Sequence, residues 1–173
     1  MLEAPKGERI TTAALAEKLD VSEAALYRHF ASKAQMYEGL IGFVEESVFG
    51  LINKISTEQE SGLKQTHAIA AMLLSFAEKN PGMTRVLIGD ALVNEDARLQ
   101  TRINQLHDRL EATLKQSLRL AATQGEIDAS ADVSAQANLM LAYITGRWHQ
   151  YAKSGFKRLP TELWQKQGPM LLG

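Results

Sequence analysis

Apolar residues recur every three or four positions along most of this chain, and that spacing restricts the secondary structure that it can form. The clearest series predicts one long amphipathic helix that ends before Gly125. No alternating run of Val, Ile and Thr reaches the length of a strand. We therefore expect an all-α protein. The series comprises Leu99, Ile103, Leu106, Leu110, Leu114 and Leu118.

Capping residues and prolines mark where individual helices begin and end. Ser32 and Gln35 form a capping box, in which each side chain accepts from a free backbone N–H at the start of a long helix. The triplet Asn80-Pro81-Gly82 predicts the end of a helix that runs from His67 to Lys79. We expect Thr161 to cap the last helix.

Two short helices with a tight turn are predicted near the N-terminus, over Thr12–Leu19 and Ser22–Phe30. In such a helix-turn-helix the second helix enters the DNA major groove while the first crosses the backbone. Ala24 and Ala25 leave room for close approach to base edges, although any helical hairpin with a serine cap has a similar pattern. The apolar seam between the two helices is expected to contain Leu15, Leu19, Val21, Leu26 and Phe30.

The residues Thr11–Ala16, Val21–Phe30 and Ser32-Lys33 together resemble the DNA-binding signature of the TetR family, most specifically in the run Tyr-Arg-His-Phe. The resemblance implies a TetR-like fold, with a helix-turn-helix DNA-binding domain over residues 1–35 and a helical dimerisation domain over residues 36–173. It also implies contacts to phosphates and bases. The expected DNA-binding residues are Thr11, Thr12, Ser22, Glu23, Ala24, Ala25, Tyr27, Arg28, His29 and Lys33.

Charge balance argues against a strong DNA-binding field in this sequence alone. The net charge is -1, and residues 1–37 carry as many acidic as basic side chains. In the TetR family another helix, often preceded by basic residues, comes before the motif, and Met1-Leu2-Glu3 resembles its last turn. We therefore expect the DNA-binding domain to be incomplete here, within a longer protein that has basic residues ahead of this segment.

Beyond the motif, the chain resembles the nucleoid occlusion factors of this family over nearly its whole length. The resemblance is carried by Arg9–Thr12, Val21–Phe30, Asn80–Gly82, Arg98–Gln100 and Arg102–Leu106. It implies a cytoplasmic, nucleoid-associated homodimer that binds palindromic double-stranded DNA and then inhibits polymerisation of the tubulin-like division GTPase FtsZ. The alternative is a TetR-type repressor released by a small ligand, with a pocket near Met72, Phe76 and Leu87.

The resemblance also indicates which residues contact partners. Leu51 and Ser75 depart from the pattern, which has a basic residue and a glycine at those positions, and core packing is the alternative for Phe43 and Met72. The terminal helices of this family form a dimeric four-helix bundle, although core packing is again the alternative. The expected FtsZ contacts are Phe43, Leu51, Met72, Ser75, Lys79 and Asn80, and the expected dimer interface is Trp148, Tyr151 and Trp164.

The sequence offers little to support catalysis. It has no cysteine, so neither a thiolate metal site nor a thiol nucleophile can form. His67, His107 and His149 each stand alone on a predicted helix, without the spacing of a metal site. We therefore expect no enzyme activity, metal or cofactor. No apolar run approaches the roughly 20 residues needed to cross a bilayer.

Overall fold

The computed structural model describes residues 1–5 and 10–172, and within them it contains helices and no β-strand. This confirms the predicted all-α class. Arg9, expected at the start of a family marker, lies outside the described residues. The helices are α1 (Thr12–Lys18), α2 (Glu23–His29), α3 (Lys33–Glu58), α4 (Gly62–Lys79), α5 (Pro81–Leu87), the 3₁₀ helix η1 (Asp90–Leu92), α6 (Ala97–Thr123), α7 (Val133–Lys153) and α8 (Trp164–Leu172).

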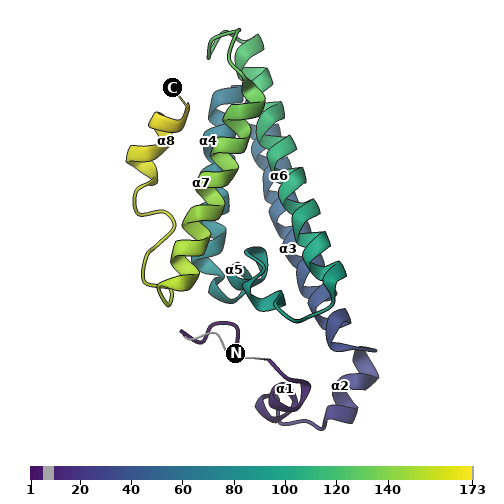
Figure 1. Cartoon of the computed structure of the whole chain (residues 1–173). Coiled ribbons are helices and arrows are strands. Elements are labelled where there is room, and N and C mark those ends of the chain that lie inside the picture. Colours follow the sequence, from purple (N-terminus) through teal and green to yellow (C-terminus); the bar gives the residue numbers. More distant parts are fainter. Residues whose placement is uncertain (6–9, 173) are drawn as a thin grey trace.

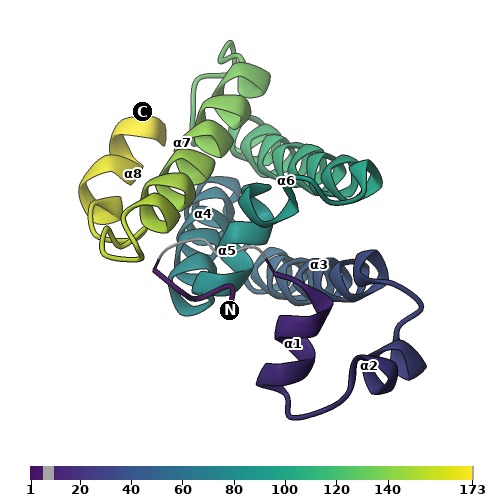
Figure 2. The ribbon, with the colours of Figure 1, turned by 60° about the horizontal axis from the view of Figure 1, so that its bottom comes forward.

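Four long helices, α3, α4, α6 and α7, pack together to form the body of the molecule (Figure 1). Helix α4 is central, since it contacts α3, α5, α6, α7 and α8. The two short N-terminal helices, α1 and α2, lie beyond one end of this body, where α3 begins (Figures 1 and 2). The fold therefore holds the predicted helix-turn-helix apart from the main core.

The core is formed by the apolar series that the sequence analysis identified. All six apolar residues of the α6 series are buried, which confirms the prediction of one amphipathic helix. Helix α4 is buried more completely, because its apolar residues cover more than one stripe. The fully buried apolar residues of α4 are Ile69, Ala70, Leu73, Leu74 and Ala77.

Helix α4 begins at Gly62, five residues before the predicted start at His67. The Ser61 side chain caps it, and the loop after α6 supplies two further acceptors. The Gly62 N–H donates to Gln124 at 2.8 Å, and the next N–H donates to Glu126 at 2.9 Å. Acceptors that are distant in sequence thus satisfy the first turn of α4, and local patterning does not reveal them.

The helix boundaries predicted from sequence form in part. Ser32 accepts from the Gln35 N–H at 3.2 Å, but the Gln35 side chain accepts from the Ala31 N–H at 2.5 Å, so the predicted reciprocal bond to Ser32 is not made. Helix α4 ends at Lys79, with Asn80 as its C-cap residue, as predicted. In place of capping the last helix, the Thr161 hydroxyl donates to the Glu78 carboxylate at 2.6 Å. Helix α8 begins only at Trp164, because Thr161 is held against the C-terminal end of α4.

The aromatic residues expected at a dimer interface lie inside the chain's own core, which corrects that prediction. Trp148, Tyr151 and Trp164 are only 1%, 4% and 2% exposed. The Trp148 indole N–H donates to the Leu73 carbonyl at 3.1 Å, and the Tyr151 hydroxyl donates to the Glu78 carbonyl at 3.0 Å. Both donors bind α4, so the aromatic face of α7 points inward.

Two glycines in helices provide a test of this packing. A Cβ on Gly62 would lie 2.3 Å from the Ala121 backbone N and 2.5 Å from the Ser117 carbonyl O, whereas a Cβ on Gly50 would have no neighbour within 4 Å. We predict that Gly62→Ala lowers the free energy of unfolding by about 1–3 kcal/mol through overpacking. Gly50→Ala should raise it by roughly 0.5–1 kcal/mol, because alanine favours the helix. Chemical denaturation of both variants measures the difference, and an unchanged Gly62→Ala protein would contradict the packing.

Candidate nucleic-acid interface

Helices α1 and α2 are each capped by a side chain that the sequence analysis assigned to DNA binding. The Thr11 hydroxyl accepts from the Ala14 N–H at 3.1 Å, and the Ser22 hydroxyl accepts from the Ala25 N–H at 3.1 Å. Between the helices, Asp20 adopts a left-handed conformation with φ of 54°. These contacts make a compact turn between two seven-residue helices.

Thr12 and Glu23 bind each other across the hairpin. The Thr12 hydroxyl donates to the Glu23 carboxylate at 2.8 Å, so the first turn of α1 is linked to the first turn of α2. This hydrogen bond restrains the angle between α1 and α2. In this structure the two residues position α2, and each remains close to the surface expected to face DNA.

The remaining predicted contacts form a largely exposed surface along α2 and the start of α1. Ala25 is half-buried, and the other side chains protrude. Their chemistry combines small residues at the N-terminal end of α2 with hydrogen-bond donors and a cation towards its C-terminal end. The exposed residues are Thr11, Ser22, Ala24, Tyr27, Arg28 and His29.

The apolar seam between α1 and α2 is smaller than predicted. Leu19, Val21 and Phe30 are 56%, 43% and 37% exposed, so their predicted places in the seam are wrong. Leu26 is buried, as is Ala16, which the sequence analysis did not name. Leu19 instead lines a groove between α1 and the body, because two seven-residue helices are too short to enclose five large side chains.

Lys33 does not extend freely toward solvent as a phosphate contact would require. Its ammonium group forms an ion pair with the Glu95 carboxylate and lies 5.8 Å from the centre of the Tyr37 ring. The side chains of Lys33 and Glu95 are 23% and 16% exposed. Sequence analysis missed Glu95, because nothing in the local pattern connects two residues that are 62 positions apart.

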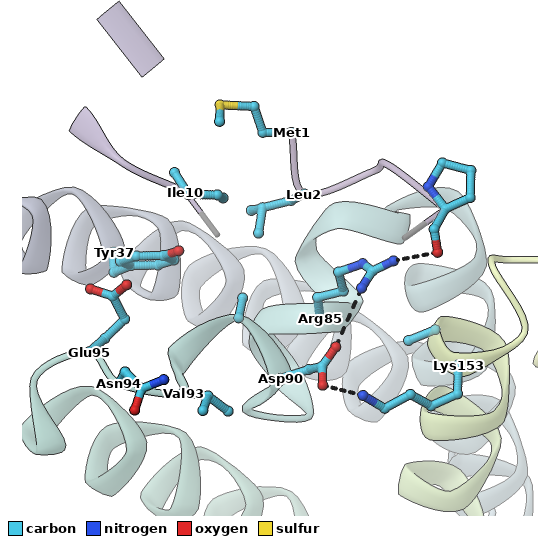
Figure 3. A pocket seen from close by; sticks show the side chains of 13 residues that line it. Met1, Leu2, Ile10, Tyr37, Arg85, Asp90, Val93, Asn94, Glu95 and Lys153 are labelled. Atoms are coloured by element: carbon cyan, nitrogen blue, oxygen red, sulfur yellow. Dashed lines mark hydrogen bonds and ion pairs between the residues drawn. The ribbon is translucent and has the colours of Figure 1, made fainter. Parts of the chain in front are cut away.

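A cavity of about 550 Å³ lies beside this ion pair and is lined by Tyr37, Glu95, the N-terminal segment, α5, η1 and the end of α7 (Figure 3). At its other end Asp90 pairs with both Arg85 and Lys153. Burial, assisted by the charge of Glu95, raises the pKa of Tyr37 to about 12. The Tyr37 phenol is therefore neutral at physiological pH.

The six residues expected to contact FtsZ lie on α3 and α4 or directly after α4. Phe43 and Leu51 are 54% and 42% exposed, so core packing does not account for Phe43. On α4, Met72 and Ser75 are half-buried and Lys79 is exposed. Positions 72, 75 and 79 share one helix face, and α3 packs against α4. The structure thus brings these residues to two adjacent helices.

Asn80 has a structural role that accounts for its position. Its side-chain amide donates to the Phe76 carbonyl at 2.7 Å and helps to end α4, while Pro81 begins α5 at once. Met72, Phe76 and Leu87, predicted to line a ligand pocket in a repressor, line neither the cavity of Figure 3 nor the groove beside α1.

The outward face of α7 carries a row of mostly small or apolar side chains that sequence analysis overlooked. The row repeats with a spacing of four and three residues, the pattern of a helix face that packs against another helix. Its members are exposed in the single chain, opposite the buried Trp148. They are Ala135, Leu139, Ala142, Gly146 and His149.

Neither catalytic nor membrane-spanning features stand out in the described part of the chain. No group of three or more His, Cys, Asp or Glu side chains within residues 1–5 and 10–172 has a geometry that could hold a metal ion. Among the same residues, no helix is both long and apolar enough to cross a bilayer. The features that the fold positions in this part of the chain are exposed surfaces and ion pairs.

Comparison with known families matches both parts of the chain. Residues 8–40 match the family described as bacterial regulatory proteins, tetR family, and residues 60–173 match the SlmA-like family described as tetracyclin repressor-like, C-terminal domain. The first match contains the helix-turn-helix, and the second contains α4 to α8.

Several curated relatives are similar over almost the full chain. The nucleoid occlusion factor SlmA of Alteromonas mediterranea is 53% identical over 96% of this chain and 86% of the relative. The same factor from Idiomarina loihiensis is 51% identical over 96% of this chain and 85% of the relative. That from a Marinomonas species is 48% identical over 99% and 87%.

A solved structure supports the fold independently of sequence. The transcriptional regulator FadR from Bacillus subtilis, solved in complex with stearoyl-CoA, superposes with a TM-score of 0.74. The match covers 95% of this chain and 88% of FadR at 16% identity, so it bears on the fold alone. It supports the arrangement of an N-terminal helix-turn-helix on a helical body.

Proposed function

Because the chain belongs to the TetR family, and within it to the SlmA nucleoid occlusion factors, we propose that it binds palindromic DNA as a homodimer and, when bound, inhibits FtsZ polymerisation. The observation that carries this proposal is the exposed surface of α2, which lies beyond the body of the molecule. Helix α2 is capped by Ser22 and is hydrogen-bonded to α1 through Thr12 and Glu23. We assign residues 1–35 to DNA binding and residues 36–173 to dimerisation and partner binding.

Recognition of DNA requires α2 to reach base edges while charged and polar groups contact phosphates. Ala24 and Ala25 allow the N-terminal end of α2 to approach the major groove closely. Arg28, His29 and Tyr27 then lie within reach of the sugar-phosphate backbone, where contacts position the protein without specifying sequence. Such a site acts by binding, and we infer a regulator in place of an enzyme, located in the cytoplasm at the nucleoid.

A homodimer would place two copies of α2 roughly 34 Å apart, one turn of DNA. We propose that the outward row on α7 forms the dimer interface, in place of the buried aromatic residues. Small side chains such as Ala142 and Gly146 allow close approach of two helices, and Leu139 supplies apolar area. Exposed apolar residues on and near α8, including Leu163 and Met170, extend this surface.

The FtsZ contact is proposed on the surface formed by α3 and α4. Phe43 offers an exposed aromatic side chain and Lys79 an exposed positive charge, and aromatic and charged groups often contribute strongly to protein interfaces. This surface belongs to the same long α3 that begins directly after the helix-turn-helix. One continuous helix therefore joins the DNA-binding unit to the partner-binding surface.

The DNA proposal predicts a loss of one phosphate contact in Arg28→Ala. Because Arg28 is exposed and pairs with no acidic side chain among residues 1–5 and 10–172, we expect weaker binding to all DNA sequences, by about tenfold near 0.1 M salt. The slope of log affinity against log salt should become shallower by about one. Lys54→Ala, an exposed lysine far along α3, is the matched control. Equal binding by Arg28→Ala and the unaltered protein would refute this docking.

The dimer proposal predicts that Leu139→Asp yields monomers. A buried, unpaired carboxylate within the row should weaken association by about a hundredfold or more. Analytical ultracentrifugation measures this change. Leu51→Asp introduces the same charge at an exposed leucine on α3 and should remain dimeric. A Leu139→Asp protein that stays dimeric would show that the interface lies elsewhere.

The FtsZ proposal predicts that Phe43→Ala reduces inhibition of FtsZ polymers about tenfold while DNA affinity is retained. Phe43 is a better site for the substitution than Asn80, because the Asn80 amide also stabilises the end of α4. Polymer sedimentation with and without specific DNA provides the measurement, and Val93→Ala, also at an exposed apolar residue, is the control. If DNA has no effect on FtsZ polymers even with the unaltered protein, a ligand-responsive repressor is the better interpretation.

A further inference from the structure

We propose that Glu95 competes with DNA for Lys33, so that the free protein holds one of its DNA-binding cations in an internal ion pair. This inference rests on the proposed DNA-binding function and deepens it, because it assigns a regulatory role to a residue outside the helix-turn-helix. The motivating observation is that the ammonium group of Lys33, at the start of α3, pairs with the Glu95 carboxylate just before α6.

The surroundings of Lys33 favour this internal pair in the absence of DNA. Both side chains are mostly buried, so the attraction is screened less than at an open surface. The neutral Tyr37 ring, whose centre lies 5.8 Å from the ammonium group, adds a weak cation–π attraction. Figure 3 shows the Glu95 carboxylate facing Tyr37 of α3. We refer to this contact region between the first half of α3 and the segment from Glu95 to Arg102 as the joint.

A phosphate oxygen and a carboxylate oxygen bind a lysine ammonium group in the same way. Each is an anionic acceptor for the ammonium N–H groups, and the Lys33 side chain, only 23% exposed, is directed to Glu95. A phosphate contact through Lys33 therefore weakens or breaks the pair with Glu95. The free energy of that pair is subtracted from the affinity for DNA of any sequence.

Two neighbouring ion pairs keep α3 attached to α6 when the ion pair between Lys33 and Glu95 opens. Glu38 pairs with Arg98 at 3.0 Å, and Glu45 pairs with Arg102 at 2.7 Å. Both pairs link α3 to α6, yet neither contains a residue expected to contact DNA. The Lys33–Glu95 pair can therefore open without freeing α3 from the body, and Glu38 offers a matched control for Glu95.

The test compares Glu95→Gln with Glu38→Gln in the full chain, using fluorescence anisotropy with a labelled palindromic duplex and with an unrelated duplex. Each variant removes one negative charge from the same joint, and its thermal unfolding midpoint reports whether the joint remains folded. We expect Glu95→Gln to bind both duplexes about fivefold more tightly, the order expected for releasing a half-buried ion pair. Glu38→Gln should change affinity by less than about twofold.

A double variant separates competition from a general charge effect. In a Lys33→Ala background there is no ammonium group to release, so adding Glu95→Gln should no longer improve binding. The proposal is overturned if Glu95→Gln binds DNA with unchanged or lower affinity, since the pair would then be neutral or would position α3 for DNA. It is also overturned if the gain persists without Lys33.

The same binding measurements separate the competition by Glu95 from DNA binding itself. If the unaltered chain binds the palindromic duplex no better than it binds the unrelated one, and Arg28→Ala binds both as the unaltered chain does, the DNA-binding assignment itself is wrong. If Arg28→Ala weakens binding while Glu95→Gln leaves it unchanged, the DNA-binding surface stands and only the competition by Glu95 is refuted.

Discussion

The burial of α4 is the constraint on which the rest of the structure depends. Its apolar residues are spread too widely around the helix to be covered by one neighbour, so α3, α6, α7 and α8 all pack against it. Trp148 and Tyr151 donate hydrogen bonds to α4 carbonyls, and this turns the aromatic face of α7 inward. The outward row of α7 is left exposed as a direct consequence.

The same constraint determines where the DNA-binding unit sits. Helix α3 packs against α4, α5 and α6, and its first residue follows α2 after three residues. The position of α2 is therefore set by how α3 is anchored to the body, through ion pairs with α6 and with the segment before it. In this arrangement, the surfaces proposed for DNA and for FtsZ lie on or next to one rigid helix.

Local patterns in the sequence predicted most helices, because caps and apolar spacing act over a few residues. The Ser22 and Ser32 caps and the α6 series formed as expected. Predictions that depended on which side of a helix faces the core were less successful. Leu19 was assigned to a seam that does not cover it, and Trp148 was assigned to an interface although it is buried within the chain.

The all-α class, the helix-turn-helix and the family follow from spacing, capping and a specific motif, all of which are local features of the sequence. The tertiary structure decided which residues remain available at the surface. It brought Glu95 to Lys33, paired Thr12 with Glu23, and turned Leu139 outward. Such contacts join positions far apart in the chain or select one face of a helix, and only the packing of whole helices against α4 fixes them.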